Sequence, residues 1–215
     1  MKKRNFWVVV VLFIMPLVFY ILLLTGTNNF AKLPVLTEQV SDVNDFNHPA
    51  LDTVTLDGNI TILCFFGDDL DAVKSNALNL NEKIYKHFYK FKDFQFVAVL
   101  PNGTEKQSEA LLKRFSVVTD MQKWKSVYGT PEQIQTLFKS LKTPFPLAEN
   151  SYTPYAFIVD KDQNLRGRVD DDDTAGILYG YNAETVAPIH NKMVDDVKVL
   201  VAEYRMALKK NKRKI

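Results

Sequence analysis

The sequence predicts an α/β fold with a central mixed sheet and flanking helices. The first observation behind this is a run of β-branched and aromatic residues, Asn59 to Phe66, that stops at Gly67 and leads directly into a helical pattern. A strand that is apolar on both faces and is followed at once by a helix is typical of a βαβ unit. The second observation is that strand and helix patterns keep alternating afterwards. Because α/β sheets usually bind ligands at the carboxyl ends of their strands, we expect any site near Gly67.

The elements next to this strand follow from the spacing of apolar residues. Thr53 to Gly58 alternates and ends in Asp-Gly, as a hairpin would. A helix is expected over residues 72–91, and Phe94 to Leu100 has the composition of a second buried strand. The inward side of the helix would be formed by Val73, Ala77, Leu80, Ile84, Phe88 and Phe91.

Two further helices should be separated by a short strand. Gln107 to Phe115 is expected to be helical and Trp124 to Tyr128 extended, and Pro131 suits the first turn of a helix that begins after Thr130. The residues expected to point inward are Ala110, Leu111 and Phe115 in the first helix, and Ile134, Leu137, Phe138 and Leu141 in the second.

The last third of the chain predicts a hairpin and a long helix. Tyr155 to Asp160 and Leu165 to Val169 flank a polar turn at residues 161–164, which is typical of two antiparallel strands. A helix follows from about Ala183 to Lys209. Its inner stripe would be Val186, Ile189, Met193, Val197, Leu200, Val201, Tyr204 and Leu208. The complete order of elements is that of a thioredoxin-like domain.

The N-terminal segment has the pattern of a membrane anchor. Phe6 to Leu24 is an apolar run of 19 residues, and no charge occurs between Asn5 and Asn29. At about 1.5 Å per residue it nearly matches a hydrocarbon layer of roughly 30 Å. A cleaved signal peptide is the alternative, but it would have a shorter apolar core and a small-x-small cleavage site. The basic residues 2–4 should stay in the cytoplasm, which places the globular domain on the extracytoplasmic side, the periplasm in a Gram-negative cell.

The chain therefore divides into five expected parts. These are a cytoplasmic basic end at 1–5, a transmembrane helix at 6–24, a tether lying over the domain at 25–52, the thioredoxin-like domain at 53–208 and a basic tail at 209–215. The tail could contact anionic lipid head groups or could simply serve solubility and the helix dipole.

The charge of the body argues against nucleic acid as a partner. The net charge of the chain is +2, but eight of its 27 basic residues lie within the two ends. Without them, 19 basic residues face 25 acidic ones, a balance of −6. Binding to phosphates needs clustered cations on the folded part.

Three stretches resemble the Sco/SenC family of membrane-anchored copper chaperones, which have a thioredoxin-like fold. They are the strand that runs into Phe66-Gly67, the segment KRFSVVTDMQKWKSVYGTPEQIQTLFKSL from Lys113, and the hairpin TPYAFIVDKDQNLRGRVD from Thr153. The ending YGYNAETVAPIHNKMVDDVKVLVAEY also resembles the family's final helix. The resemblance covers most of residues 54–204, and it is a resemblance of the fold.

The family binds copper through a Cys-x-x-x-Cys pair after the central strand and a histidine before the hairpin. Here Gly67 to Lys74 contains no cysteine, and Ser151 to Pro154 contains no histidine. The chain is thus a divergent relative to which these ligands cannot be transferred, and no catalytic, metal or cofactor residue is assigned.

Other sulfur and nitrogen donors do not form a readable site. Cys64 is the one cysteine and lies inside the strand, several residues before the helix start that would stabilise a thiolate, so we expect an inert, buried side chain. The histidines are His48, His87 and His190, and their positions lack the spacing of metal ligands.

The candidate surface loop consists of Asp68, Asp69, Asp71, Thr153 and Pro154. The three aspartates stand where carboxylates cap a helix and favour its dipole. In thioredoxin-like folds a cis-proline before the hairpin faces this loop, so Pro154 is expected beside it with a cis bond.

A separate acidic run, Asp170 to Asp173, is either a solvated loop or a Ca²⁺ site.

Two functions remain open at this point. The first is a membrane-tethered, extracytoplasmic binding or assembly module without a redox or copper site, whose partners would be the lipid bilayer, through residues 6–24, and a membrane or periplasmic protein. The second is an active copper chaperone or thiol-disulfide factor of the Sco type in cytochrome oxidase assembly, the one case that would call for copper. Because dithiol exchange needs two sulfurs, the single cysteine favours the first.

Overall fold

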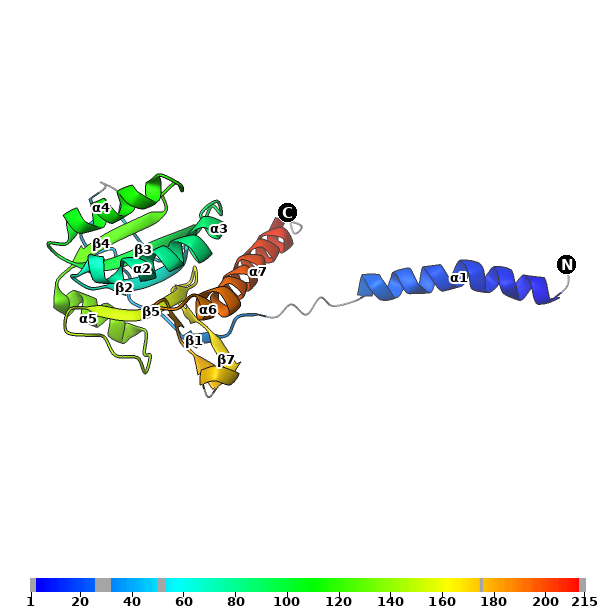
Figure 1. The fold of residues 1–215 in the computed structure, drawn as a ribbon. Coiled ribbons are helices and arrows are strands. Elements are labelled where there is room, and N and C mark those ends of the chain that lie inside the picture. Colours follow the sequence, from blue (N-terminus) through cyan, green and yellow to red (C-terminus); the bar gives the residue numbers. More distant parts are fainter. Residues whose placement is uncertain (1–2, 26–31, 50–52, 175, 213–215) are drawn as a thin grey trace. The chain divides into compact units, whose positions relative to one another are not determined.

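The computed structural model describes residues 3–25, 32–49, 53–174 and 176–212 (Figure 1). The chain forms two compact units, Met1–Ala31 and Lys32–Ile215.

The first unit contains one helix, α1 (Lys3–Thr25), which includes Pro16. Its described side chains are those of residues 7–22, and large apolar ones such as Trp7 and Phe13 are exposed. In the part of the chain that the structure describes, no helix combines the length and the apolar character that crossing a membrane requires. The span expected from Phe6 to Leu24 is therefore not confirmed and stays a prediction.

The second unit is built on a seven-stranded mixed sheet. The strands are β1 (Val35–Thr37), β2 (Ile60–Phe66), β3 (Phe94–Pro101), β4 (Trp124–Gly129), β5 (Tyr152–Val159), β6 (Leu165–Arg166) and β9 (Tyr181–Asn182). Their order is β1-β6-β5-β2-β3-β4, and β9 pairs with β5. β2, β3 and β4 are parallel, whereas β5 runs antiparallel to β2. This confirms the predicted mixed sheet around the central strand.

Helices cover the sheet as Figure 1 shows. They are α2 (Leu70–Leu80), η1 (Asn81–Tyr85), α3 (Lys86–Phe88), α4 (Glu105–Ser116), α5 (Pro131–Ser140), α6 (Val186–Pro188), η3 (Ile189–Met193) and α7 (Val194–Lys212). The segments η1 and η3 are π-helical turns. The helix predicted over 72–91 is thus one continuous run from α2 to α3. The helix after Thr130 has the first-turn proline expected of it, and the structure adds a capping box at Thr130.

Alternate side chains of β2 enter two separate hydrophobic clusters. Ile62 and Cys64 pack in a cluster with α2, α4 and α7. Leu63 and Phe65 pack in another with α5 and with Val40 of the preceding segment. All seven residues of β2 are buried, so the strand is apolar on both faces as predicted.

Residues 32–49, which the sequence assigns to a tether, are packed into the domain. β1 pairs with β6 at one edge of the sheet, Val40 is buried, and Asn47 forms a bridge to Tyr128 of β4 at the other edge. The compact unit accordingly begins at Lys32 rather than at residue 53. We call residues 32–49 the strap.

Asp42 fixes the strap to the rest of the domain. Its carboxylate accepts hydrogen bonds from the Thr55 hydroxyl at 2.5 Å, the Leu56 amide at 2.8 Å and the Gln163 side-chain amide at 2.7 Å. A charged acceptor with several donors forms comparatively strong hydrogen bonds. One side chain therefore joins the strap, the segment before β2 and the turn before β6.

The hairpin predicted over Thr53 to Gly58 is wrong. These residues pair with no strand and end in a turn in which the Asn59 amide donates to the Leu56 carbonyl. The reason is that side chains take up the backbone groups of the segment: Gln95 donates to the Thr55 carbonyl at 2.7 Å, and Asp42 accepts from the Leu56 amide.

Smaller differences concern the ends of elements. Ala110 and Val186 are exposed rather than inward, because the core-facing side of α4 is set by Leu111 and Phe115 and Val186 is the first residue of its helix. The side chain of Leu208 lies outside the described residues. The strand expected up to Val169 breaks after β6, and β7 (Arg168–Asp171) pairs with β8 (Gly176–Leu178) in a second, two-stranded sheet, with η2 (Asp172–Thr174) between them.

Candidate functional site

The carboxyl end of β2 turns sharply at Gly67. Its φ is +69°, and a Cβ placed there would lie 2.9 Å from the Asn150 carbonyl oxygen and 2.9 Å from the Tyr152 Cβ. A positive φ is a conformation that glycine adopts without cost, whereas L side chains are strained in it. Gly67 therefore lets the loop after β2 pass directly against the segment before β5.

The two aspartates after Gly67 have different partners. Asp69 is the N-cap of α2, and its side chain accepts a hydrogen bond from the Ala72 amide at 3.1 Å. Asp68 accepts one from the side-chain amide of Asn150, also at 3.1 Å. The capping predicted for Asp69 is confirmed, and Asp68 instead joins the loop to residues 142–151.

Asp71 lies in the first turn of α2, beside a pocket between α2 and α4. The pocket measures 260 Å³. It is lined by Leu70, Asp71, Lys106, Gln107, Ala110, Leu111 and Arg114. The Leu70 amide donates to the Gln107 side chain at 3.2 Å, which holds the two helix starts together. The charged side chains of Asp71, Lys106 and Arg114 are thus exposed around the apolar residues that form the base of the pocket.

Tyr152 occupies the space next to this loop. Its hydroxyl accepts a hydrogen bond from the Asn76 side chain at 2.9 Å and donates one to the Glu184 carboxylate at 3.2 Å. Partial burial, followed by the Glu184 carboxylate, raises the pKa of Tyr152 to about 12. The phenol consequently stays protonated at neutral pH and acts as a structural link between α2, β5 and the segment before α6.

Thr153 and Pro154 lie on β5, but the cis bond expected before Pro154 is wrong. Every peptide bond of the described residues is trans. The Pro154 carbonyl accepts from the Ala183 amide at 2.8 Å, so that the backbone here is held by the pairing that leads into β9. The Thr153 hydroxyl is buried and lacks a hydrogen-bond partner among the described residues.

Cys64 is buried inside β2, as predicted. Its neighbours in the sheet are Ala98 on β3 and Ala156 on β5, and its exposed fraction is 2%. Burial raises the pKa of the Cys64 thiol well above its ordinary value. A thiol held neutral and out of solvent is neither a good nucleophile nor a good metal ligand.

The histidines are not brought together. The His48 ring contacts the Ser126 carbonyl through Nδ1 at 2.7 Å, while His87 and His190 are exposed on separate helical segments. The described residues contain no group of three or more His, Cys, Asp or Glu side chains that could hold a metal ion.

The acidic run 170–173 is partly neutralised by a lysine. Lys192 lies 2.6 Å from a carboxylate oxygen of Asp171 and 2.6 Å from one of Asp173. The Thr174 hydroxyl donates to the other oxygen of Asp171. These contacts explain the run as part of an ion-paired turn between β7 and β8.

The residues that sequence reasoning missed are polar partners from distant segments. Asn76, Asn150 and Glu184 bond to the loop or to Tyr152, yet none belongs to a recognisable motif. The one available signal was Asn76, a polar residue in a position that the helix buries. The arrangement offers exposed carboxylates and hydrogen-bonding groups, which suit binding through polar contacts, and holds no nucleophile beside a general base.

The fold is thioredoxin-like, and the loop after its central strand carries acids and amides in place of thiols. Among solved structures, the chain is similar to BsSco, a member of the Sco family of cytochrome c oxidase assembly proteins in which a disulfide switch was identified. The two are 16% identical, with a TM-score of 0.53, over 78% of this chain and 95% of BsSco.

A candidate protein disulfide isomerase from Bacteroides thetaiotaomicron is also similar, with 11% identity and a TM-score of 0.53 over 82% of this chain and 98% of that one. At these identities the likeness establishes the fold. No protein-family model and no curated protein matches the chain. The fold implied by the Sco/SenC resemblance is confirmed, and Sco proteins are among the structural neighbours.

The residues present do not fit a copper ion held as the family resemblance implies. Cu(I) prefers soft thiolate and thioether ligands. The loop after β2 offers Asp68 and Asp69, which are hard oxygen ligands, and Cys64 points into the core cluster instead of toward the loop.

The contact of Gly67 with the segment before β5 gives a stability prediction. Gly67→Ala should lower the free energy of unfolding by about 3 kcal/mol, because a strained φ adds to a steric overlap. Gly58→Ala is the matched control, since Gly58 has a φ of +74° but a Cβ placed on it would have no atom within 4 Å, and it should cost about 1 kcal/mol. Urea unfolding followed by circular dichroism measures both. Equal decreases in the free energy of unfolding for the two variants would show that the contact of Gly67 with Asn150 and Tyr152 does not contribute to the cost.

Proposed function

We propose that the chain is a membrane-anchored, extracytoplasmic thioredoxin-like protein that works as a binding or assembly module and transfers neither copper nor electrons. The observation that carries this proposal is the chemistry of the loop after β2. It holds Asp68, bonded to Asn150, and the capping residue Asp69, while the one thiol of the chain is buried within β2. Dithiol exchange needs two sulfurs, which the chain lacks.

The surface beside the loop supports a binding role. Asp71, Lys106 and Arg114 are exposed around the apolar floor of the pocket between α2 and α4. Loops and helix starts on a rigid scaffold commonly carry recognition. Charges of both signs around apolar side chains suit a protein partner, in keeping with the membrane or periplasmic partner expected from the sequence.

The alternative is a Sco-type copper chaperone or thiol-disulfide factor in cytochrome oxidase assembly. What favours it is the likeness of the fold to BsSco. It would require Cys64 to become accessible, and the strand that buries Cys64 is hydrogen-bonded on both sides.

The anchor is supported by the uncharged run Phe6 to Leu24 and by the helical conformation of Lys3–Thr25. The basic residues 2–4 favour a cytoplasmic N-terminus, and hence an extracytoplasmic domain. We infer that residues 6–24 hold the domain at the membrane.

A copper titration separates the two functions. The purified full chain should not retain stoichiometric Cu(I) in competition with a chelator, because its thiol is neutral and buried. Iodoacetamide should alkylate Cys64 at neutral pH only after denaturation, and Cys64→Ser is the control for both assays. A tight Cu(I) site that disappears in Cys64→Ser would establish the chaperone function instead.

A crosslinking experiment tests the binding role. A photoreactive benzoyl-phenylalanine at Asp71 should give a discrete crosslinked protein in membranes of the native cells, because Asp71 borders the proposed surface. The same group at Asp57, exposed at the opposite end of β2, should give none. Identical products from both positions, or none from Asp71, would contradict a binding surface at the loop.

The anchor has its own test. Alkaline carbonate should leave the full chain in the membrane pellet, whereas deletion of residues 6–24 should release it, because extraction removes proteins that lack a lipid-embedded segment. Release of the intact chain would refute the anchor.

A further inference from the structure

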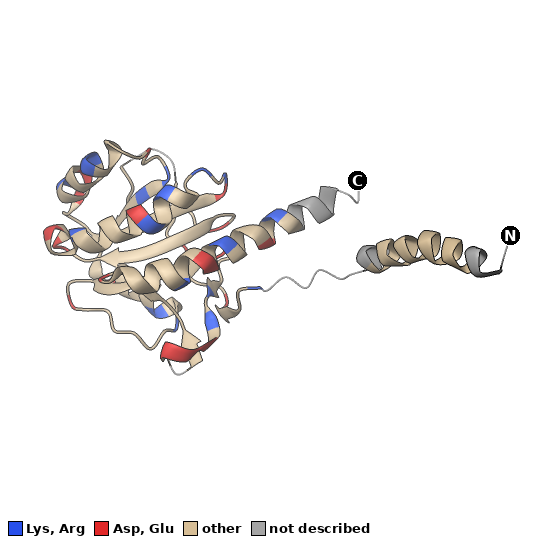
Figure 2. Cartoon of the chain, turned by 45° about the vertical axis from the view of Figure 1, so that its right-hand side comes forward, with Lys and Arg blue, Asp and Glu red and all other residues tan. Residues whose placement is uncertain are grey.

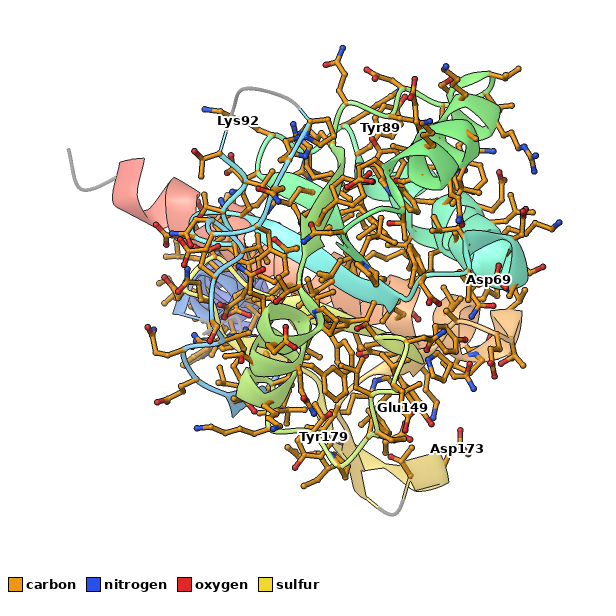
Figure 3. All side chains as sticks on the ribbon, turned by 90° about the vertical axis from the view of Figure 1, so that its left-hand side faces the viewer. Asp69, Tyr89, Lys92, Glu149, Asp173 and Tyr179 are labelled. Carbon is orange, nitrogen blue, oxygen red and sulfur yellow. The ribbon has the colours of Figure 1, made fainter. Side chains whose placement is uncertain are left out.

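A groove lies at the amino end of the central strands, at the opposite end of β2 from the candidate loop. It measures 290 Å³. It is lined by Ile60, Lys90, Phe91, Lys92, Asp93, Lys161, Val201, Tyr204 and Arg205. Figure 3 shows Lys92, from this groove, and Asp69, from the loop, on opposite sides of the domain.

The groove is positively charged although the body of the protein is negative. Four of its lining residues are cations and one is an acid, Asp93. Asp93 is already paired with Lys161, and the hydrogen bond from this lysine holds the pKa of the Asp93 carboxyl below its usual range. Lys90, Lys92 and Arg205 form no ion pair with a carboxylate of the described residues. Figure 2 shows positive residues both in the loop after α3 and on α7.

Aromatic rings alternate with these cations. The Arg205 guanidinium lies 4.6 Å from the centre of the Phe91 ring, and Lys161 Nζ lies 5.3 Å from that of Tyr204. The Lys123 ammonium donates to the Phe91 carbonyl and, at 2.8 Å, to the Lys92 carbonyl, which fixes the loop that carries the cations. Cations beside aromatic rings suit the boundary between lipid head groups and acyl chains.

Further cations follow this groove along the chain. α7 continues beyond Arg205 to Lys212, and its sequence adds Lys209, Lys210 and Lys212. The strap begins at Lys32, so the proposed anchor and the domain are separated by residues 25–31, which span about 25 Å at most. The proposed anchor would keep the start of the domain within about this distance of the bilayer.

We propose that this groove binds the phosphate groups of anionic lipids and so turns the candidate loop away from the membrane. The proposal rests on the anchor of the proposed function, which brings the groove to the lipid. Since β2 has seven residues, the groove and the candidate loop are separated by roughly 23 Å along this strand. Anionic lipid surfaces attract clustered lysine and arginine, and the attraction falls off within a Debye length, so the groove has to lie directly at the surface.

Hydrogen exchange of the full chain in nanodiscs tests the proposal. Amides of residues 88–93 should exchange roughly tenfold more slowly in nanodiscs that contain phosphatidylglycerol than in phosphatidylcholine alone, because the groove is covered only by anionic lipid. The double variant Lys90→Glu/Lys92→Glu should lose this difference. The control Lys106→Glu/Arg114→Glu changes the net charge by the same amount at the other end of the domain. It should keep the difference in exchange between the two lipids.

Three results would overturn the proposal. The first is equal exchange of residues 88–93 in both lipids, and the second is loss of their protection in the Lys106→Glu/Arg114→Glu control as well. The third is protection by inorganic phosphate in nanodiscs of phosphatidylcholine alone, which would indicate a soluble phosphate ligand. Circular dichroism of each variant shows that it is folded. Failure of the anchor itself would appear differently, as a chain that is retained in neither kind of nanodisc.

Discussion

The structure depends on the complete burial of β2. This strand exposes none of its seven side chains, and its backbone is paired with β3 on one side and β5 on the other. A strand of this kind is stable only if both faces of the sheet are covered. The helices α2, α4 and α7 cover one face, while α5 and the strap cover the other. Asp42 then joins the strap to the segment before β2 and to the turn before β6, so that the strap is held by polar contacts as well as by apolar packing.

Much of this fold could be predicted from the sequence, because the predictive signals are local. The apolar run of β2, the spacing of Val73 and Ala77 and the first-turn proline Pro131 each act within a few residues, and each is confirmed. The strap could not be predicted in the same way. Its packing depends on one carboxylate, Asp42, that meets donors more than 100 residues away in Gln163, and a polar segment with such a partner has the same composition as a free linker.

The candidate site shows the same division between local and distant contacts. Capping by Asp69 follows from the sequence, since the N-cap bond joins residues three apart. The bonds of Asp68 to Asn150 and of Tyr152 to Glu184 join segments that are distant in the sequence, and no local spacing of residues predicts them. The cis bond expected before Pro154 did not follow from the residue type, since every peptide bond of the described residues is trans. A scaffold can thus be recognised from its regular elements while the chemistry at its loop has to be read from the individual side chains.

The strap has a consequence for how other proteins can approach this one. An open strand at the edge of a sheet invites another chain to pair with it, and many recognition domains bind their ligands in this way. Here one edge ends in β1, which is only three residues long, and the other is met by Asn47 at Tyr128. Neither edge offers a long row of free amides and carbonyls, so a partner has to meet side chains and helix ends. Identical copies of the domain have equally little opportunity to associate by extending their sheets, because neither β1 nor β4 presents a long open edge.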